Sequence, residues 1–92
     1  MTAVLLRGRA AKALRQAPEN VQMAFSVWKE EVQQAGISAA RANPLWHDHP
    51  LKGNKAGRRS VYLDYSWRAE YVIDKATGAI TVEVMEVHNH EY

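Results

Sequence analysis

The sequence contains no cysteine, a single phenylalanine, three prolines and five glycines in 92 residues. Without cysteine the chain can form neither a disulfide nor a thiolate metal site, which agrees with a reducing compartment. No apolar run approaches the roughly 18 residues that cross a bilayer. The opening MTAVLLRGRA also reaches charged residues too soon for a signal peptide. These absences predict a cytoplasmic protein with no membrane partner.

The basic residues of the chain are unevenly distributed, although its net charge is only +2. Six of the twelve fall between Arg41 and Arg68, where only Asp48 and Asp64 carry the opposite charge. After Ala69 the balance reverses and acidic residues dominate. A small protein polarised in this way is expected to present a basic face to an acidic partner, of which nucleic acid is the commonest.

The first half of the chain predicts a strand followed by two helices. Residues 2–6 are apolar and partly β-branched, which indicates a strand, and the Ala-rich residues 9–16 favour a helix. Pro18 suits the first turn of a second helix that Gly36 would end with a left-handed cap. The buried stripe of that helix, at the spacing of one helical face, consists of Val21, Ala24, Phe25, Trp28, Val32 and Ala35. Ser38 is expected to cap one further helical turn over residues 39–42.

The second half changes to a period of two, which predicts strands over residues 59–64, 67–74 and 79–87. A tight reversal at Tyr65 and a turn over residues 74–78 would join them into an antiparallel meander. Met85 departs from the alternation, which indicates a bulge or a strand covered on both faces. We therefore expect one α+β domain over residues 1–92. It would consist of an N-terminal strand and two helices packed on one face of a roughly four-stranded antiparallel sheet.

The stretch from His47 to Tyr71, HDHPLKGNKAGRRSVYLDYSWRAEY, combines histidines, cations and tyrosines. Its first part, residues 47–57, is rich in turn-forming residues and is expected to be a surface loop. Cations beside histidine and tyrosine suit a phosphate site, because arginine and lysine neutralise charge while histidine or tyrosine moves protons. The alternative is a solvated basic loop followed by an ordinary hairpin, with Arg59 and Arg68 paired to Asp64 or Glu70 at the sheet edge.

This stretch, together with the ending VHNHEY, resembles the RelE/ParE superfamily of toxins from bacterial toxin–antitoxin modules. The likeness is greatest to RelE-type and HigB-like messenger-RNA endonucleases. They share a histidine-containing loop with Pro-Leu-Lys-Gly, then Gly-x-Arg-Ser, an aromatic–Arg pair leading to tyrosine, and a His-x-Tyr terminus. The order of strand, helices and sheet is also that of the family, so the resemblance implies a RelE-like fold over the whole chain.

The resemblance implies a ribosome-dependent mRNA endonuclease that needs no metal or other cofactor and is held inactive by a cognate antitoxin. The RNA 2′-OH would attack its own 3′ phosphate, leaving a cyclic phosphate and a 5′-OH. The positions that match the family's catalytic set are Arg59, Arg68, His47, His88, His90 and Tyr92. The positions expected to contact RNA are Lys52, Lys55, Arg58, Tyr62 and Trp67. Tyr62 stands where relatives often have another arginine, and Trp67 replaces a usual tyrosine; both offer surfaces on which a base can stack.

Other functions remain open at the level of sequence. The superfamily also contains gyrase-poisoning toxins that lack the catalytic set, and a small sheet with exposed tyrosine and arginine can bind RNA without cutting it. The pairs His47-x-His49 and His88-x-His90 also have a spacing that suits Zn²⁺ or Cu²⁺, although no carboxylate or thiol pattern completes a recognised site. An acid–base residue within reach of the arginines is the feature that would favour cleavage.

Overall fold

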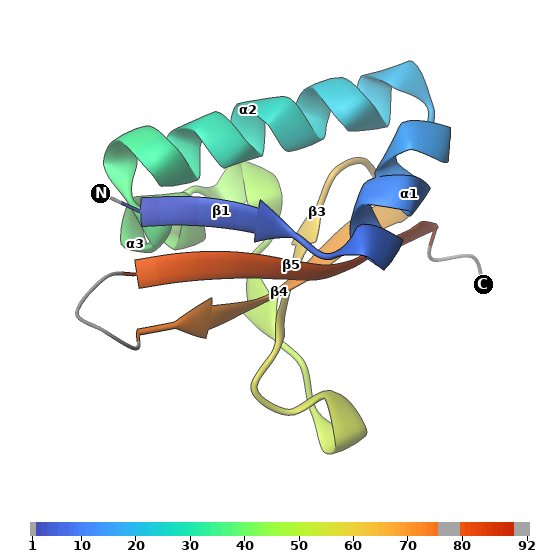
Figure 1. Cartoon of the computed structure of the whole chain (residues 1–92). Coiled ribbons are helices and arrows are strands. Elements are labelled where there is room, and N and C mark those ends of the chain that lie inside the picture. The colour runs from blue at the N-terminus through green and yellow to red at the C-terminus, as the bar shows by residue number, and fades with distance from the viewer. Residues whose placement is uncertain (1, 76–79, 90–92) are drawn as a thin grey trace.

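The computed structural model describes residues 2–75 and 80–89. Along the chain the elements are β1 (Thr2–Leu6), α1 (Gly8–Gln16), α2 (Glu19–Ala35), α3 (Ile37–Ala42), the 3-10 turn η1 (Pro44–Trp46), β2 (His49–Pro50), the 3-10 turn η2 (Gly53–Lys55), β3 (Arg59–Tyr62), β4 (Trp67–Asp74) and β5 (Ile80–Asn89). Figure 1 shows α2 lying along one side of the sheet, with the loop that carries η2 extending from the other side. None of the helices described is long and apolar enough to span a membrane.

Within the described residues the strands form a single five-stranded sheet in the order β1-β5-β4-β3-β2. The neighbours from β2 to β5 are antiparallel, whereas β1 runs parallel to β5. The α+β class is confirmed, and the sheet has five strands where about four were predicted. The prediction that the sheet is antiparallel is wrong for one pairing, that of β1 with β5. A parallel neighbour needs a long crossover, and here everything from α1 to β4 lies between β1 and β5. The strand β2 pairs through two residues only, which is too short to show alternation.

The helix α2 supplies much of the core, as its apolar period predicts, although Ala35 at the end of the predicted stripe is exposed. Val21, Phe25, Trp28 and Val32 are buried along one face of the helix, and the Trp28 ring packs against Tyr71 of β4 at 5.4 Å between centroids. Truncating a buried tryptophan typically costs about 3–5 kcal/mol. These aromatic residues therefore hold the sheet in place and leave its opposite face available for a site.

Gly36 joins α2 to α3 with a φ of 91° and a ψ of 162°. The positive φ confirms that glycine is needed there, but the ψ is extended and not left-handed helical. Gly36 is also the N-cap residue of α3, which starts at Ile37. The predicted cap at Ser38 is therefore wrong, because the chain has already turned at the glycine.

A β-bulge between β4 and β5 decides which residues of β5 face the core. Glu70 lies opposite Glu86, but the next residue, Tyr71, lies opposite Val84, so Met85 is the additional residue. Of the two alternatives that the sequence left open, the bulge is therefore the one that the structure shows. It places Val84 and Val87 in the core. The predicted turn over residues 74–78 falls largely outside the described residues.

Candidate active site on the open face of the sheet

A hollow of about 310 Å³ lies on the face of the sheet opposite α2. It is lined by His49, Leu51, Lys55, Ser60, Tyr62, Arg68, Glu70 and His88. The period of two explains this set, since Ser60 and Tyr62 share one face of β3 while Val61 points into the core. Arg68 on β4 and His88 on β5 are partners in the strand register. A cation and an imidazole therefore stand side by side in this hollow, which we call the cationic pocket.

Arg68 is buried and held in place by backbone carbonyl groups. Its guanidinium donates to the carbonyl oxygens of Asp64 at 2.9 Å, Trp67 at 3.1 Å and Tyr65 at 3.0 Å. The same group lies 3.5 Å from the centroid of the Tyr62 ring, a geometry that favours a cation over an aromatic face. Its Nε–H and one terminal hydrogen are not used in these three bonds. Arg68 is thus a fixed positive charge with donors to spare.

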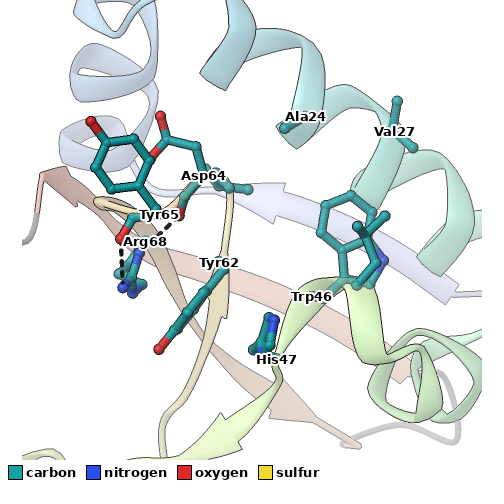
Figure 2. Close-up of a pocket in the computed structure, with 10 residues that line it drawn as sticks. Ala24, Val27, Trp46, His47, Tyr62, Asp64, Tyr65 and Arg68 are labelled. Carbon is teal, nitrogen blue, oxygen red and sulfur yellow. Dashed lines mark hydrogen bonds between the residues drawn. The ribbon is translucent and has the colours of Figure 1, made fainter.

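Tyr62 separates the guanidinium of Arg68 from the ring of His47, as Figure 2 shows. The His47 ring is stacked on Tyr62 at 4.7 Å, and the His49 ring meets Tyr62 edge-on at 6.1 Å. His47 has a φ of 48°, a left-handed conformation that turns the chain after η1. The His47 carbonyl then lies 2.8 Å from Nδ1 of His49. These contacts bring both loop histidines to the edge of the sheet.

A larger and more apolar hollow of about 650 Å³ adjoins the cationic pocket. Its lining residues are Ala24, Val27, Leu45, Trp46, His47, Tyr62, Leu63, Asp64, Tyr65 and Arg68. Tyr62 and Arg68 border both hollows, so the two adjoin at these side chains. Figure 2 shows Tyr62 and Arg68 among the residues that line the larger hollow. Tyr65 at its rim is 89% exposed. We call this hollow the apolar pocket.

The carboxylate of Glu70 is the centre of a charged cluster at the other side of the cationic pocket. Its side chain is only 5% exposed, and it accepts hydrogen bonds from Lys55 at 2.9 Å, His88 at 2.8 Å and Arg58 at 3.3 Å. Lys55 also reaches Glu86 at 3.4 Å. Burial alone would raise the pKa of Glu70, but the hydrogen bonds from Lys55 and His88 outweigh it and lower the pKa. The hydrogen bond to Glu70 in turn raises the pKa of Lys55.

Arg59 lies on the other face of β3 and does not line the cationic pocket. Its Nε donates to Asp48 at 2.5 Å, and the hydroxyl of Tyr71 donates to the same fully buried carboxylate. Burial raises the pKa of Tyr71, and its bond to Asp48 adds to this effect. The ion pair of Arg59 is therefore with Asp48, whereas the sequence suggested Asp64 or Glu70.

Three further residues that the sequence predicted for the site, Trp67, Lys52 and Arg58, do not line the cationic pocket. Trp67 is partly buried against the core, on the face away from the pocket. Lys52 is exposed at the start of η2, outside the lining of both hollows. Arg58 touches the pocket only through Glu70. His90 and Tyr92 lie outside the described residues.

Among the residues that the structure describes, one set of donor atoms could hold a metal ion. Single donor atoms from Glu70, Glu86 and His88 lie within 4.8 Å of one another, a combination that suits Zn²⁺ or Cu²⁺. The ammonium group of Lys55 is already bonded to both carboxylates. A metal would have to displace that cation, so these residues fit an ion pair better than a metal centre.

Glu70, Asp48 and His49 were not assigned to the site from sequence. The sequence marks Glu70 only as a charged residue in the middle of a buried strand. Its cationic partners lie 12 and 15 residues away along the chain, too far for their spacing to reveal the contact. The sequence signals for His49 are its spacing from His47, which suits a metal-binding pair, and its place where the resembling family commonly has a glutamate. The structure places His49 and His88 in the same pocket.

Comparison with known proteins gives likenesses of structure only. No protein-family model and no curated protein matches the sequence. The chain is similar to the RelBE2 toxin–antitoxin complex from Mycobacterium tuberculosis, with a TM-score of 0.68, 20% identity and coverage of 97% of this chain and 96% of that one. It is similar to YafQ from E. coli, with a TM-score of 0.75, 12% identity and coverage of 97% and 93%.

The chain is also similar to the archaeal RelE–RelB complex from Pyrococcus horikoshii, with a TM-score of 0.72, 14% identity and coverage of 96% and 93%. All three alignments extend over nearly the whole of both chains. The protein therefore has the fold of RelE-type toxins, from the first strand to the last.

Proposed function

We propose that the protein is the toxin of a toxin–antitoxin pair and that it inhibits translation by cutting messenger RNA on the ribosome. The fold supports the first part, since the similar structures include toxins in complex with their antitoxins. The observation that carries the second part is the cationic pocket. Arg68 and His88 line it together as cross-strand partners, and His49 lies in the same hollow. This arrangement supplies a cation and acid–base groups in one place.

Arg68 is the residue that stabilises the phosphate. In the reaction negative charge gathers on the oxygens around phosphorus, and a preorganised cation in a sheltered site lowers the energy of that state. Arg68 meets this requirement because its carbonyl partners and Tyr62 fix the guanidinium before RNA arrives. No metal ion is needed for this stabilisation. Lys52, which is exposed nearby in the loop, is assigned to the RNA backbone.

The two imidazoles of the pocket act as the general base and the general acid of the reaction. One takes the proton of the 2′-OH as its oxygen forms a bond to phosphorus, and the other gives a proton to O5′ as the P–O5′ bond breaks. The products are a 2′,3′-cyclic phosphate and a 5′-OH, so atoms and charges balance without a further reactant. Imidazole suits both steps because its unperturbed pKa of about 6.5 lies near neutrality. His88 and His49 are the residues in these roles.

The apolar pocket accommodates a base next to the cut. Single-stranded RNA is generally recognised by stacking its bases on aromatic side chains. Tyr65 offers an exposed ring at the rim, and Leu45 and Val27 are also exposed there. Tyr62 contributes an edge only, since both its faces are covered by Arg68 and His47.

The antitoxin partner is assigned to the same two pockets. Because Tyr62 and Arg68 border both pockets, a polypeptide that fills the apolar pocket also covers the cationic one. The exposed apolar side chains at the rim suit such a contact. This arrangement would keep the toxin inactive until the antitoxin is removed.

The test is to express the protein in growing bacteria and to map the ends of the cellular mRNA. We expect new 5′ ends within coding sequences soon after induction, and none with His88→Ala. A gyrase-directed toxin would instead change plasmid supercoiling and leave mRNA whole. An RNA-binding protein without activity would stop growth, if at all, without either change. Intact mRNA during growth arrest would therefore contradict the proposal.

A further inference from the structure

A buried carboxylate is an unexpected feature in a pocket for phosphate, because like charges repel each other. Glu70 nevertheless lies in the cationic pocket, between the strand partners of β3 and β5. Its oxygens are bonded to one imidazole and two cations. A group placed in this way either opposes the binding of RNA or has a task of its own.

We propose that Glu70 is a positioning residue, which orients the imidazole of His88 as the base and fastens the loop of residues 51–58 over the cationic pocket. The proposal rests on the proposed RNA cleavage for its chemical meaning. Its structural part concerns the contacts of Glu70 with His88 and with the loop cations Lys55 and Arg58, so it can be tested separately.

The first contact fixes the tautomer of His88. An ionised carboxylate can only accept hydrogen bonds, so the His88 Nε2 that lies 2.8 Å from Glu70 must carry a hydrogen. In a neutral ring Nδ1 is then the basic nitrogen. Glu70 is ionised because its pKa is lowered in the folded protein. A carboxylate that holds one ring nitrogen in this way sets the direction in which the other accepts a proton.

The second contact joins the loop to the sheet. Lys55 ends η2 and bonds to Glu70 on β4 and to Glu86 on β5. Arg58 at the other end of the same loop bonds to the second oxygen of Glu70. These two cations balance the charge of Glu70, so the carboxylate does not repel the phosphate. They also keep one wall of the pocket closed.

Neutralising Glu70 should move the pH profile of cleavage in a definite direction. A negative charge beside an imidazole favours the protonated ring, and its removal disfavours that form. The other charged or titratable groups around His88 and Glu70 stay in place; they are Arg68 on β4, Glu86 on β5, Tyr62 on β3, His49 on β2, and Lys55 and Arg58 from the loop. The pH profile of cleavage should therefore move toward lower pH when Glu70 is neutralised.

The experiment compares Glu70→Gln with wild type in single-turnover cleavage on programmed ribosomes between about pH 5 and 9. We expect the acid limb of the cleavage profile to move toward lower pH, with a rate at the optimum about 10-fold lower. Glu83→Gln is the matched control, since it removes the same charge from β5 but from an ion pair with Arg7 outside the pocket. Unchanged limbs in a folded Glu70→Gln protein, or an equal shift in the control, overturn the proposal.

A second readout needs neither cleavage nor a variant. The ring ¹⁵N shifts of His88 in the wild-type protein report its tautomer, and we expect the Nε2–H form at neutral pH. The Nδ1–H form would overturn the proposal even where Glu70→Gln fails to fold. If the tautomer is Nε2–H but the wild type does not cut RNA, the proposed function fails while the contact of Glu70 with His88 stands.

Discussion

Arg68 and His88 are register partners on adjacent strands, and both side chains line the same pocket on the face of the sheet away from α2. The β-bulge at Met85 makes this possible. It resets the alternation of β5, so that Val84 and Val87 both enter the core while His88 stays on the open face. The pairing of two strands, and not a loop, therefore sets the position of the guanidinium relative to the imidazole.

Replacement of His88 by alanine should abolish cleavage and leave the fold intact. Loss of a general acid or base typically lowers a rate by about 10²–10⁴-fold. The ring is partly exposed and lies outside the core, so the melting temperature should change little. Single-turnover cleavage and a thermal melt measure the two effects. His49→Ala should behave similarly, and cleavage that persists in both variants would exclude the two imidazoles.

Replacement of Arg68 should affect both activity and stability, because the residue has two sets of contacts. Arg68→Ala removes the cation and the donor to the carbonyl groups of Asp64 and Tyr65, while the carbonyl of Trp67 keeps its hydrogen bond from the Leu63 N–H. Unsatisfied buried groups cost about 1–3 kcal/mol. Arg68→Lys keeps the charge but cannot bridge three carbonyls, so it should recover part of the activity. Full toxicity of the alanine variant in a growth assay would contradict the role of Arg68.

Arg59→Ala should act on stability and much less on cleavage. Its partner Asp48 is fully buried, and removing one member of a buried pair typically costs about 3–5 kcal/mol, here at the lower end because Arg59 is partly exposed. Urea denaturation measures the loss, and cleavage per folded molecule should stay close to wild type. A variant that is as stable as wild type but does not cleave RNA would contradict this prediction and indicate that Arg59 takes part in catalysis.

The turn between β3 and β4 should make the protein sensitive to acid. Burial alone would raise the pKa of Asp64, but hydrogen bonds from the backbone N–H groups of Trp67 and Ser66 lower it below its usual value of 3.8. A lowered pKa gives stability that is complete above the unfolded value and is lost as the pH falls through the folded value. We expect the melting temperature to fall below about pH 4, and less steeply in Asp64→Asn. If the melting temperatures of wild type and Asp64→Asn fell equally steeply with pH, this prediction would be wrong.

Treatment with a chelator should leave both the melting temperature and cleavage unchanged. Lys55 already bridges Glu70 and Glu86, the two carboxylates that would join His88 around a metal. A melt with and without EDTA, beside a cleavage assay, measures both quantities. A drop in melting temperature on chelation would favour the metal site.

The elements with a clear local period were predictable from sequence, and the long-range pairings were not. The stripe from Val21 to Val32 predicted α2 and its buried face, and alternation placed Tyr62 and Arg68 away from the core. The parallel pairing of β1 with β5 leaves no local mark, because the partner strand is more than 70 residues away. The strand β2 has only two residues, too few for a pattern.

The same limit applied to the site. Residues of the predicted stretch line both pockets, but each arginine was expected to face the phosphate, whereas Arg59 pairs with Asp48. Asp48 holds Arg59 across 11 residues and Glu70 gathers Lys55 and His88 from either side, so both carboxylates act through contacts that spacing does not reveal. The basic appearance of the loop was therefore misleading, since most of its charge is neutralised within the molecule.

The central claim is that the cationic pocket cuts RNA, and the end groups of the product test it most directly. Purified protein is mixed with ribosomes that carry a defined mRNA, and the fragments are analysed for their termini. We expect cuts that bear a 2′,3′-cyclic phosphate and a 5′-OH, present with wild type and absent with His88→Ala. Intact mRNA with a folded wild-type protein, or fragments with a 3′-OH and a 5′-phosphate, would contradict the account.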